Sequence, residues 1–538
     1  MEFMPSLLPP LTSLLCQERG IKDETHKSYQ NWIPFEIYLI NIFLNRFFEV
    51  VPGAFAWATL IAIVFFSWTA PGWVAIFIIL FDTYWFLKTL YFSIHMRAAF
   101  REMRSRMKKN WLRELNGLSD KNVRVPFGWR DIYHLVIIPM YNEPYGVVAE
   151  SLRSLAGINY PKDKLIVVLG TEAHVPEARA TAAQLAQDFG SLFLRFLVTE
   201  HVLDTANEIP GKGSNETWAA KEAKKLIDKI GIPYERILVS SLDSDTQVFP
   251  EYFGVVTHAF LTCASPQRSS FQPVPLFINN VFTAPALARV IAFSASFWHL
   301  IQQSRPERLT TFSSHTMPFQ ALVEIGFWHT HVVSEDSRIF WQCFLHYHGD
   351  WRVEPIFYPV AMDANVAPTF WRTMANVYKQ QRRWGWGCEN IPYLLSGFIR
   401  DKKILMRKKV YWVFHIIEGF HSWATNAIII FSLGWLPIVL GGALFRVSVL
   451  SFNLPRITRT IMMLAMVGIV SSAVLSILLL PPKPAWFKRR HYILYFVQWL
   501  LSPLTLIIFG AFPALEAQTR LMFGGKWRLG FWVTPKFR

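Results

Sequence analysis

Hydrophobic and polar positions divide this 538-residue chain into three regions. Apolar residues crowd the first hundred positions and the positions after 410, whereas the middle, from about 131 to 390, alternates short apolar runs with polar loops. Long apolar stretches are typical of membrane-spanning helices, and short apolar runs are typical of buried strands. The pattern therefore predicts a membrane protein that carries a globular α/β domain between its apolar ends.

Two apolar segments near the N-terminus predict a helical hairpin. GAFAWATLIAIVFFSW (53–68) and GWVAIFIILFDTYWFLKTLYF (72–92) each approach the roughly 20 residues that cross a bilayer. The uncharged TAPG between them predicts a turn. We expect a polar tail and an interfacial helix over 1–50, without a cleaved signal peptide, and the transmembrane hairpin over 51–96.

The apolar pattern resumes after 410, with spans near 422–442, 461–480 and 492–513. Five spans would place the basic tail at 514–538 outside the cell, against the positive-inside rule. We therefore expect either a sixth crossing or a broken or re-entrant helix around Pro503 to Pro513. The residues before these spans, 391–421, predict amphipathic helices at the membrane interface.

The formal net charge of +16 accompanies only 17% charged residues, and the basic residues gather beside the apolar spans. Basic runs of this kind lie at 96–113, 400–409 and 488–490. They mark cytoplasmic loops and can hold anionic lipid headgroups, so we do not expect nucleic acid as a partner. The four cysteines are scattered, as expected of a domain in a reducing cytosol.

Four short aliphatic runs in the middle region each end in a polar loop: HLVIIPMYNEP (134–144), KLIVVLG (164–170), SLFLRFLVTE (191–200) and RILVSSLDSD (236–245). Helical stretches rich in Ala, Glu and Lys separate them, which predicts a mostly parallel sheet covered by helices. Ligands of such sheets bind beyond the carboxyl ends of the strands. The polar residues after these runs are therefore the candidate site.

Asp243 and Asp245 follow the last of these runs, one residue apart. Two carboxylates at this spacing can face one divalent cation, with substrate phosphate oxygens completing its shell. An acidic turn without a metal is the alternative for such a pair taken alone. Upstream, Asn142 and Glu143 offer acceptors suited to a base or a ribose, or they simply form a turn.

Two further sites begin predicted helices. Lys212 lies between glycines in GKGSNETW (211–218), and Asn215 is expected to cap the helix that follows. A helix start with a nearby lysine suits a phosphate, although an exposed loop with an ordinary cap fits equally. Glu335 and Asp336 begin an amphipathic helix. Their carboxylates either interact favourably with the positive end of the helix dipole or, in a dry cleft, supply a general base.

The stretch YKQQRRWGWG (378–387) combines cations with aromatic rings in the spacing Q-x-x-R-W, formed by Gln380, Arg383 and Trp384. A tryptophan face can stack on a sugar ring and an arginine can neutralise a diphosphate. An interfacial helix that meets lipid headgroups fits the pattern equally. His-x-His at 329–331 has a spacing that can bind Zn²⁺, but we expect structural or acceptor-facing histidines there.

The order of these motifs resembles one enzyme family. P-x-Y-N-E, K-G-x-N, D-x-D, E-D and Q-x-x-R-W occur in the same succession in the processive, membrane-embedded family 2 glycosyltransferases, the group of cellulose and hyaluronan synthases. The likeness covers roughly residues 130–390 and extends to the flanking helices in layout. It implies an α/β, GT-A-type nucleotide-sugar-binding domain over 97–390 with a mostly parallel sheet, flanked by transmembrane α-helices, the C-terminal set at 422–513.

The resemblance also implies roles at the sugar donor. Glu143 would lie against the nucleoside, and Lys212, with Asn215 nearby, would approach the diphosphate. Asp243 and Asp245 would bind the phosphates of the nucleotide sugar through Mg²⁺ or Mn²⁺.

At the acceptor, the resemblance makes Asp336, next to Glu335, the base that deprotonates the attacking hydroxyl. Gln380 would bind substrate, Arg383 would lie near the pyrophosphate, and Trp384 would hold the terminal acceptor sugar.

The sequence departs from the family pattern at three places. Thr171 and Glu172 stand where the family usually has Asp, so we expect Glu172 to contact the nucleobase with a longer reach. Ser334 replaces the threonine of a T-E-D motif, and 312–328 stands in place of the acceptor-side F-x-C-G-T-like element. Donor and acceptor identity therefore cannot be taken from cellulose synthase.

The expected function is transfer of a sugar, with inversion, from a nucleotide diphosphate sugar such as a UDP-sugar to a growing polysaccharide, coupled to export. A non-processive enzyme that adds one sugar to a lipid or lipid-linked acceptor is the alternative, and a non-enzymatic membrane protein is a third. Expected partners are the donor, a glycan acceptor, membrane lipids, and accessory or export subunits. We expect a multi-pass protein of the plasma membrane with a cytoplasmic catalytic domain.

Overall fold

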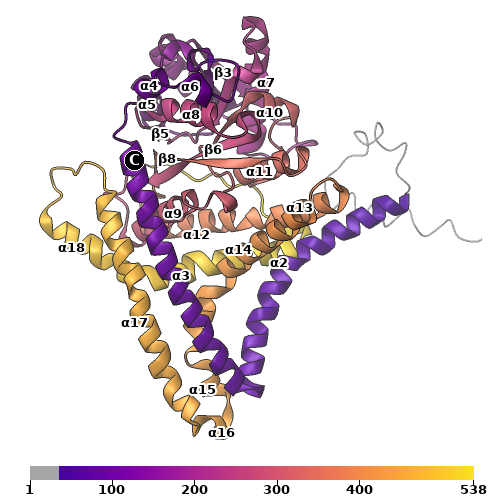
Figure 1. Cartoon of the computed structure of the whole chain (residues 1–538), viewed down its shortest axis with the longest axis vertical. Helices are drawn as coiled ribbons and strands as arrows, with labels where there is room; N and C mark the ends of the chain where they lie inside the picture. Colours follow the sequence, from indigo (N-terminus) through magenta and orange to yellow (C-terminus); the bar gives the residue numbers. More distant parts are fainter. Residues whose placement is uncertain (1–34, 538) are drawn as a thin grey trace, which may run out of the picture.

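The computed structural model describes residues 35–537, and the side chains of 43–537 apart from Asp120 and Leu433. An α/β domain lies at one end of the molecule, and long helices extend away from it to a narrow tip (Figure 1). Most of the predicted N-terminal tail, with Cys16, lies outside the described residues.

One mixed sheet forms the centre of the α/β domain. In the described part of the chain it has eight strands in the order β3-β2-β1-β4-β7-β6-β8-β5. The first four strands in that order are parallel, as are β6 and β8, whereas β7 and β5 run antiparallel to their neighbours. The strands are β1 (Tyr133–Pro139), β2 (Leu165–Glu172), β3 (Arg195–His201), β4 (Ile237–Ser241), β5 (Gln247–Val248), β6 (Ser269–Phe277), β7 (Thr316–Pro318) and β8 (Arg352–Met362).

The aliphatic runs of the sequence become strands β1 to β4, and helices cover both faces of the sheet. Alternate residues of β1 point to opposite faces: Leu135 and Ile137 join the core under α7, whereas Val136 and Ile138 join the core under α5, α6 and α8. All eight residues of β2 are buried, as expected of a strand covered on both sides. These helices are α5 (Tyr145–Ala156), α6 (Pro176–Phe189), α7 (Lys212–Ile230) and α8 (Tyr252–Thr262).

The N-terminal hairpin forms as predicted, from α2 (Phe35–Thr69) and α3 (Pro71–Arg106), with Ala70 alone between them. The predicted interfacial helix is not a separate element, because α2 runs through it without a break. Pro52 lies inside α2, where a proline removes one backbone hydrogen bond. Figure 1 shows α2 bending partway along its length.

Four helical stretches in the described residues are long and apolar enough to cross a membrane: Phe43–Thr69, Pro71–Arg106, Val449–Leu478 and Arg489–Phe523. The span predicted near 422–442 is not among them. That region instead contains the end of α14 (Met406–Leu433) followed by the short helices α15 (Leu436–Leu440) and α16 (Gly442–Arg446). Helix α17 (Val449–Leu478) then returns from the tip and packs along α3 (Figure 1).

The fourth stretch is a broken helix, one of the two forms that the sequence allowed. It consists of α18 (Arg489–Val497), α19 (Ser502–Leu506) and α20 (Phe512–Phe523), joined by a 3-10 turn at Gln498–Leu501 and a π-helical turn at Ile507–Ala511. Pro503 and Pro513 lie in the first turns of α19 and α20, where their missing N–H groups are tolerated. Figure 1 shows this stretch running crosswise to α3 and α17, beneath α9 (Ala286–Gln303) and α12 (Phe370–Gly385).

Candidate active site

Lys212 stands at the centre of the candidate site. Its Nζ lies 2.8 Å from Oδ1 of Asp243 and 2.9 Å from Oδ1 of Asp336, and two further carboxylates follow at 3.5 Å (Glu216) and 4.0 Å (Glu335). The K-G-x-N, D-x-D and E-D motifs, far apart in the sequence, therefore meet at one ammonium group.

Close packing of two helix starts brings these groups together. Lys212 is the first residue of α7, and Glu335 is the first residue of α11 (Glu335–His346). A Cβ atom at Gly213 would lie 3.0 Å from the backbone oxygen of His329 and 3.1 Å from Cβ of Glu335. Gly213 thus allows α7 to approach α11 closely enough for Lys212 to contact both motifs.

The four carboxylates differ in their affinity for protons. Burial raises the pKa of Glu216 to about 7, against the opposing effect of Lys212. Burial, and then the charge of Asp336, raise the pKa of Glu335 well above its usual value. At Asp243 burial acts in the same direction, but Lys212 and Lys536 outweigh it and lower the pKa. Glu216 and Glu335 therefore hold a proton more tightly than Asp243 does.

Asp245 is fully buried and faces a second lysine. Its Oδ2 accepts a hydrogen bond from the backbone N–H of Asp363 at 2.9 Å and lies 2.7 Å from Nζ of Lys536. Asn279 donates to the backbone oxygen of Asp245 and to Oδ1 of Asp363. Burial, and then the charge of Asp245, raise the pKa of Asp363 to about 8.

Lys536 belongs to residues 528–537, which we call the C-terminal segment. This segment has no regular secondary structure and lies over the site. Phe531 packs against Gly211, where a Cβ would lie 3.2 Å from its ring, and the Arg383 guanidinium lies 5.7 Å from the ring centroid. The Trp532 ring centroid is 5.5 Å from Nζ of Lys379. The sequence showed only a basic tail here, and FWVTPK was not recognised as part of the site.

The donor set fits a divalent cation that shares its shell with a substrate. No three His, Cys, Asp or Glu side chains of the described residues converge to hold a metal ion by themselves. However, Asp245, Asp243 and Asp363 all raise the pKa of Lys536, against its burial, so one ammonium stands in the field of three carboxylates. Mg²⁺ favours this arrangement, because it is usually bound by one or two carboxylates with phosphate oxygens and water.

The Q-x-x-R-W residues lie on α12 beside the same region. Gln380 accepts a hydrogen bond of 3.4 Å from Asn365. Asn365 lies two residues after Asp363 in the chain. Trp384 is partly buried, with its ring centroid 5.9 Å from that of Phe277 at the end of β6, and it helps to line a small hollow with Gln380. Four of the five predicted motifs therefore surround one region at the carboxyl ends of the strands.

Glu143 is drawn into this region as well. Its Oε2 accepts the backbone N–H of Tyr141 at 2.7 Å. Burial raises the pKa of Glu143, and Tyr141 and Lys536 oppose the rise. The charge of Lys536, which pairs with Asp245, therefore also acts on Glu143.

Glu172 and Asn215, predicted separately, contact each other. Asn215 donates to Oε1 of Glu172 at 2.9 Å, and His201 Nδ1 lies 2.9 Å from Oε2. Asn215 is not the helix cap that we expected, because α7 already begins at Lys212 and Asn215 lies buried in its first turns. A Cβ at Gly170 would collide with the Asn215 side chain, so Gly170 allows the amide to reach Glu172.

A loop before β7 supplies residues that sequence reasoning missed. Ser313 donates to Oδ2 of Asp243 at 2.8 Å, and Thr311 donates to the backbone oxygen of Asp336 at 2.6 Å. His315 is buried, with Nδ1 3.9 Å from Oδ1 of Asp336. Ser314 has φ 67°, a backbone strain that is often found at functional sites. The signal was the polar stretch FSSHT (312–316), at the start of the segment where the sequence departs from the family pattern.

The histidines at 329–331 show the expected structural contact. His329 packs edge-on against Tyr393, with ring centroids 5.4 Å apart. Burial lowers its pKa to about 4.

Comparison with known proteins adds a family and two groups of solved structures. The chain aligns over 72% of its length with 97% of the mannosyltransferase PcManGT from Pyrobaculum calidifontis in complex with GDP-Man and Mn²⁺, at 17% identity and TM-score 0.40. It aligns over 74% of its length with 93% of S. aureus TarS 1–349 in complex with UDP-GlcNAc, at 11% identity and TM-score 0.34. No curated protein matches the chain.

The family model described as "Glycosyl transferase family group 2" matches residues 238–512. This range is more than half of the chain and contains Asp243, Asp245, Asp336 and the Q-x-x-R-W residues. The predicted GT-A-type α/β domain with flanking apolar helices is confirmed. The chain therefore belongs to glycosyl transferase family group 2, whose members transfer a sugar from a nucleotide sugar.

Proposed function

We propose that this protein transfers a sugar from a nucleoside diphosphate sugar, in the first instance a UDP-sugar, to a growing polysaccharide with inversion at the anomeric carbon. The observation that carries the proposal is the meeting of Asp243 and Asp336 at Lys212 Nζ, 2.8 and 2.9 Å away. It puts a phosphate-binding group and a base candidate next to each other, as a single-displacement transfer requires.

The donor end of the site is formed by Asp243, Asp245 and Lys212. A bound Mg²⁺ or Mn²⁺ held by the two aspartates would neutralise the charge of the departing diphosphate. Lys212 reaches the diphosphate from the start of α7, where backbone N–H groups and the helix dipole also favour an anion. Glu143 and Glu172 lie beside this end and would contact the nucleoside.

Asp336 is the proposed base. The neighbouring Glu335 carries a pKa well above its usual value, because burial and the charge of Asp336 disfavour a second anion. Glu335 therefore holds its proton more tightly than an ordinary glutamate, which leaves Asp336 to accept the proton from the acceptor. The acceptor oxygen bonds to the anomeric carbon, the bond to the diphosphate breaks, and the hydroxyl proton passes to Asp336.

The acceptor sugar would stack on Trp384, with Gln380 and Arg383 between it and the diphosphate. Replacing the ring, Trp384→Ala, should reduce transfer to the acceptor by about tenfold while donor hydrolysis falls less. Initial rates of both reactions on the same preparation measure this split. An equal loss of both would contradict the stacking role.

Apolar helices lie directly beneath the acceptor end, which supports a membrane-bound synthase that passes its product to the bilayer. A Cβ at Gly385 would lie 3.0 Å from Cα of Ala514, so α12, which carries Trp384, packs closely on α20 of the broken helix. We propose a multi-pass protein of the plasma membrane with a cytoplasmic catalytic domain, working with membrane lipids and with accessory or export subunits.

The test uses the purified full-length chain in lipid, a panel of radiolabelled nucleotide sugars, and Mn²⁺ or Mg²⁺. We expect release of free nucleoside diphosphate and a ladder of long products by gel or mass spectrometry. A product that carries one added sugar would replace polysaccharide synthesis with the non-processive alternative. Absence of nucleotide release with every sugar would overturn the proposed reaction.

A further inference from the structure

Glu389 joins the end of the Q-x-x-R-W segment to the start of the E-D segment. It is the last residue of the 3-10 turn Trp386–Glu389, which continues α12 directly beyond Gly385. Its Oε1 accepts hydrogen bonds from the backbone N–H groups of Val333 and Ser334, each at 3.1 Å, and from the Ser334 hydroxyl at 2.7 Å. One carboxylate oxygen therefore holds the backbone immediately before the E-D motif.

The three donors belong to the turn that leads into α11. Ser334 is the N-cap residue of this helix, yet its hydroxyl does not cap the helix and donates to Glu389 instead. The N–H groups of Val333 and Ser334 lie before the first helical residue, where the helix itself offers them no carbonyl acceptor. Glu389 therefore sets the path by which the chain enters α11.

The Glu389 side chain is itself held firmly. Its Oε2 accepts a hydrogen bond of 2.9 Å from Nε1 of Trp386, whose side chain is almost completely buried. The buried Arg338 of α11 donates to the backbone oxygen of Glu389 at 3.1 Å and to Oδ1 of Asn390 at 2.6 Å. Asn390 in turn donates to the Ser337 hydroxyl at 2.9 Å. These contacts join the first turns of α11 to the segment that follows α12.

Contacts on both sides thus place the Asp336 carboxylate. Its backbone oxygen accepts from Thr311 at 2.6 Å and its side chain lies 2.9 Å from Nζ of Lys212, while Glu389 fixes the turn that precedes it. A base must lie within hydrogen-bond reach of the hydroxyl that it deprotonates. Trp384, the proposed acceptor platform, lies five residues before Glu389 on the same continuous helical segment.

We propose that Glu389 is a positioning residue for the transfer reaction: it holds the turn before α11 so that the Asp336 carboxylate faces the acceptor sugar on Trp384. Glu389 acts through the backbone of this turn and through Ser334, and it is not a catalytic residue. The acceptor platform and the base are thereby held as one unit. This inference rests on the proposed base role of Asp336.

The experiment compares Glu389→Gln with the unaltered chain, each full length and purified in lipid. An amide of the same size cannot replace the carboxylate, because its oxygen can accept from the turn or from Trp386 while its N–H groups then face donors on the other side. We expect release of nucleoside diphosphate from the nucleotide-sugar panel to fall by about tenfold. Equilibrium binding of that diphosphate, with Mn²⁺ present, should be unchanged. A loss of binding as large as the loss of turnover would overturn the proposal.

A double-mutant cycle with Asp336→Asn separates positioning from a general structural effect. If Glu389 acts through Asp336, Glu389→Gln should lower the residual turnover of Asp336→Asn by less than about twofold. The same tenfold loss in both backgrounds would show that Glu389 acts elsewhere, and would overturn its role while leaving the base role of Asp336 intact. Normal turnover in Asp336→Asn alone would instead remove the base role, and the positioning role with it.

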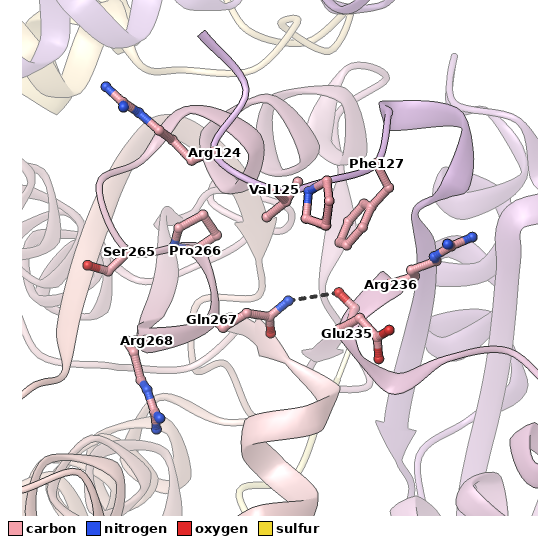
Figure 2. A pocket seen from close by; sticks show the side chains of 10 residues that line it. Arg124, Val125, Phe127, Glu235, Arg236, Ser265, Pro266, Gln267 and Arg268 are labelled. Atoms are coloured by element: carbon pink, nitrogen blue, oxygen red, sulfur yellow. Dashed lines mark hydrogen bonds between the residues drawn. The ribbon is translucent and has the colours of Figure 1, made fainter. Parts of the chain in front are cut away.

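Gln267→Ala is the matched structural control. Gln267 Nε2 donates to the backbone oxygen of Glu235 at 2.9 Å, so this side chain also links two segments that are distant in the sequence. The link lies beside a pocket of about 420 Å³ at the amino ends of β4 and β6, and Figure 2 shows it as a dashed line. Turnover should be unchanged in this variant. A tenfold loss here would mean that breaking any such link impairs turnover, and would overturn the specific role of Glu389.

Discussion

Two buried lysines neutralise the candidate carboxylates, and they come from opposite kinds of structure. Lys212 is the first residue of α7 and is tied to Asp243 and Asp336, which end a strand and begin a helix. Lys536 pairs with Asp245 from the C-terminal segment, which has no regular secondary structure.

The difference indicates which cation can be exchanged. Lys212 is held by the backbone hydrogen bonds of α7 and by the packing of Gly213 against α11, so it cannot leave without unfolding part of the domain. Lys536 is held by its own charge and by the packing of Phe531 and Trp532. A divalent cation with a diphosphate offers Asp245 a stronger partner, so we expect Lys536 to leave when the donor binds.

The largest effect is expected at the base beside Lys212. Asp336→Asn removes the proton acceptor and keeps the shape of the side chain, so transfer should fall by about a thousandfold, with donor binding retained. Turnover and donor affinity measure the two effects. Asp350→Asn, on the exposed loop after α11, is the matched control, and unchanged turnover in Asp336→Asn would remove Asp336 from the base role.

Lys212→Gln should be the next most damaging change. It leaves Asp243 and Asp336 without their shared cation, and breaking a buried pair in this way costs about 3–5 kcal/mol of stability. We expect transfer to fall by about a hundredfold together with the thermal midpoint. The exposed Lys225→Gln on the same helix serves as control. A stable variant with normal donor affinity would show that Lys212 is not the fixed cation of the site.

Lys536→Gln should strengthen the binding of a divalent metal ion. Without the ammonium to displace, the apparent affinity for Mn²⁺ should rise by about tenfold. Metal titration by electron paramagnetic resonance measures the affinity, and Lys526→Gln outside the segment is the control. Weaker Mn²⁺ binding would mean that Lys536 helps to hold the donor instead of competing with the metal.

The smallest effect concerns pH. The folded protein raises the pKa of Asp363 from 3.8 to about 8, through burial and the charge of Asp245. The folded state therefore binds more protons than the unfolded state between these values, and this group makes stability fall as pH rises from 3.8 through about 8. Asp363→Asn should flatten that decline by a few degrees of thermal midpoint. An unaltered pH profile would contradict the raised pKa.

The local sequence pattern identified only part of the candidate site. Asp243, Asp245 and Asp336 were identified because each follows a strand or opens a helix, positions that the period of the apolar residues reveals. Asn215 was assigned wrongly as a cap, because a glycine-flanked lysine can begin a helix as readily as an asparagine can. Ser313 and His315 were missed, because a short loop that touches a site only through space has no periodic signature.

The sequence by itself determined the strands β1 to β4 and the hairpin of α2 and α3, and it supplied the candidate residues for phosphate, metal and proton transfer. These depend on neighbours a few positions apart, where apolar periodicity and turn residues act directly. Only the tertiary structure decided that the antiparallel β7 enters the sheet, that α14 ends early, and that Lys536 reaches Asp245. These contacts join residues far apart in the chain and depend on how whole elements pack, so no local pattern encodes them.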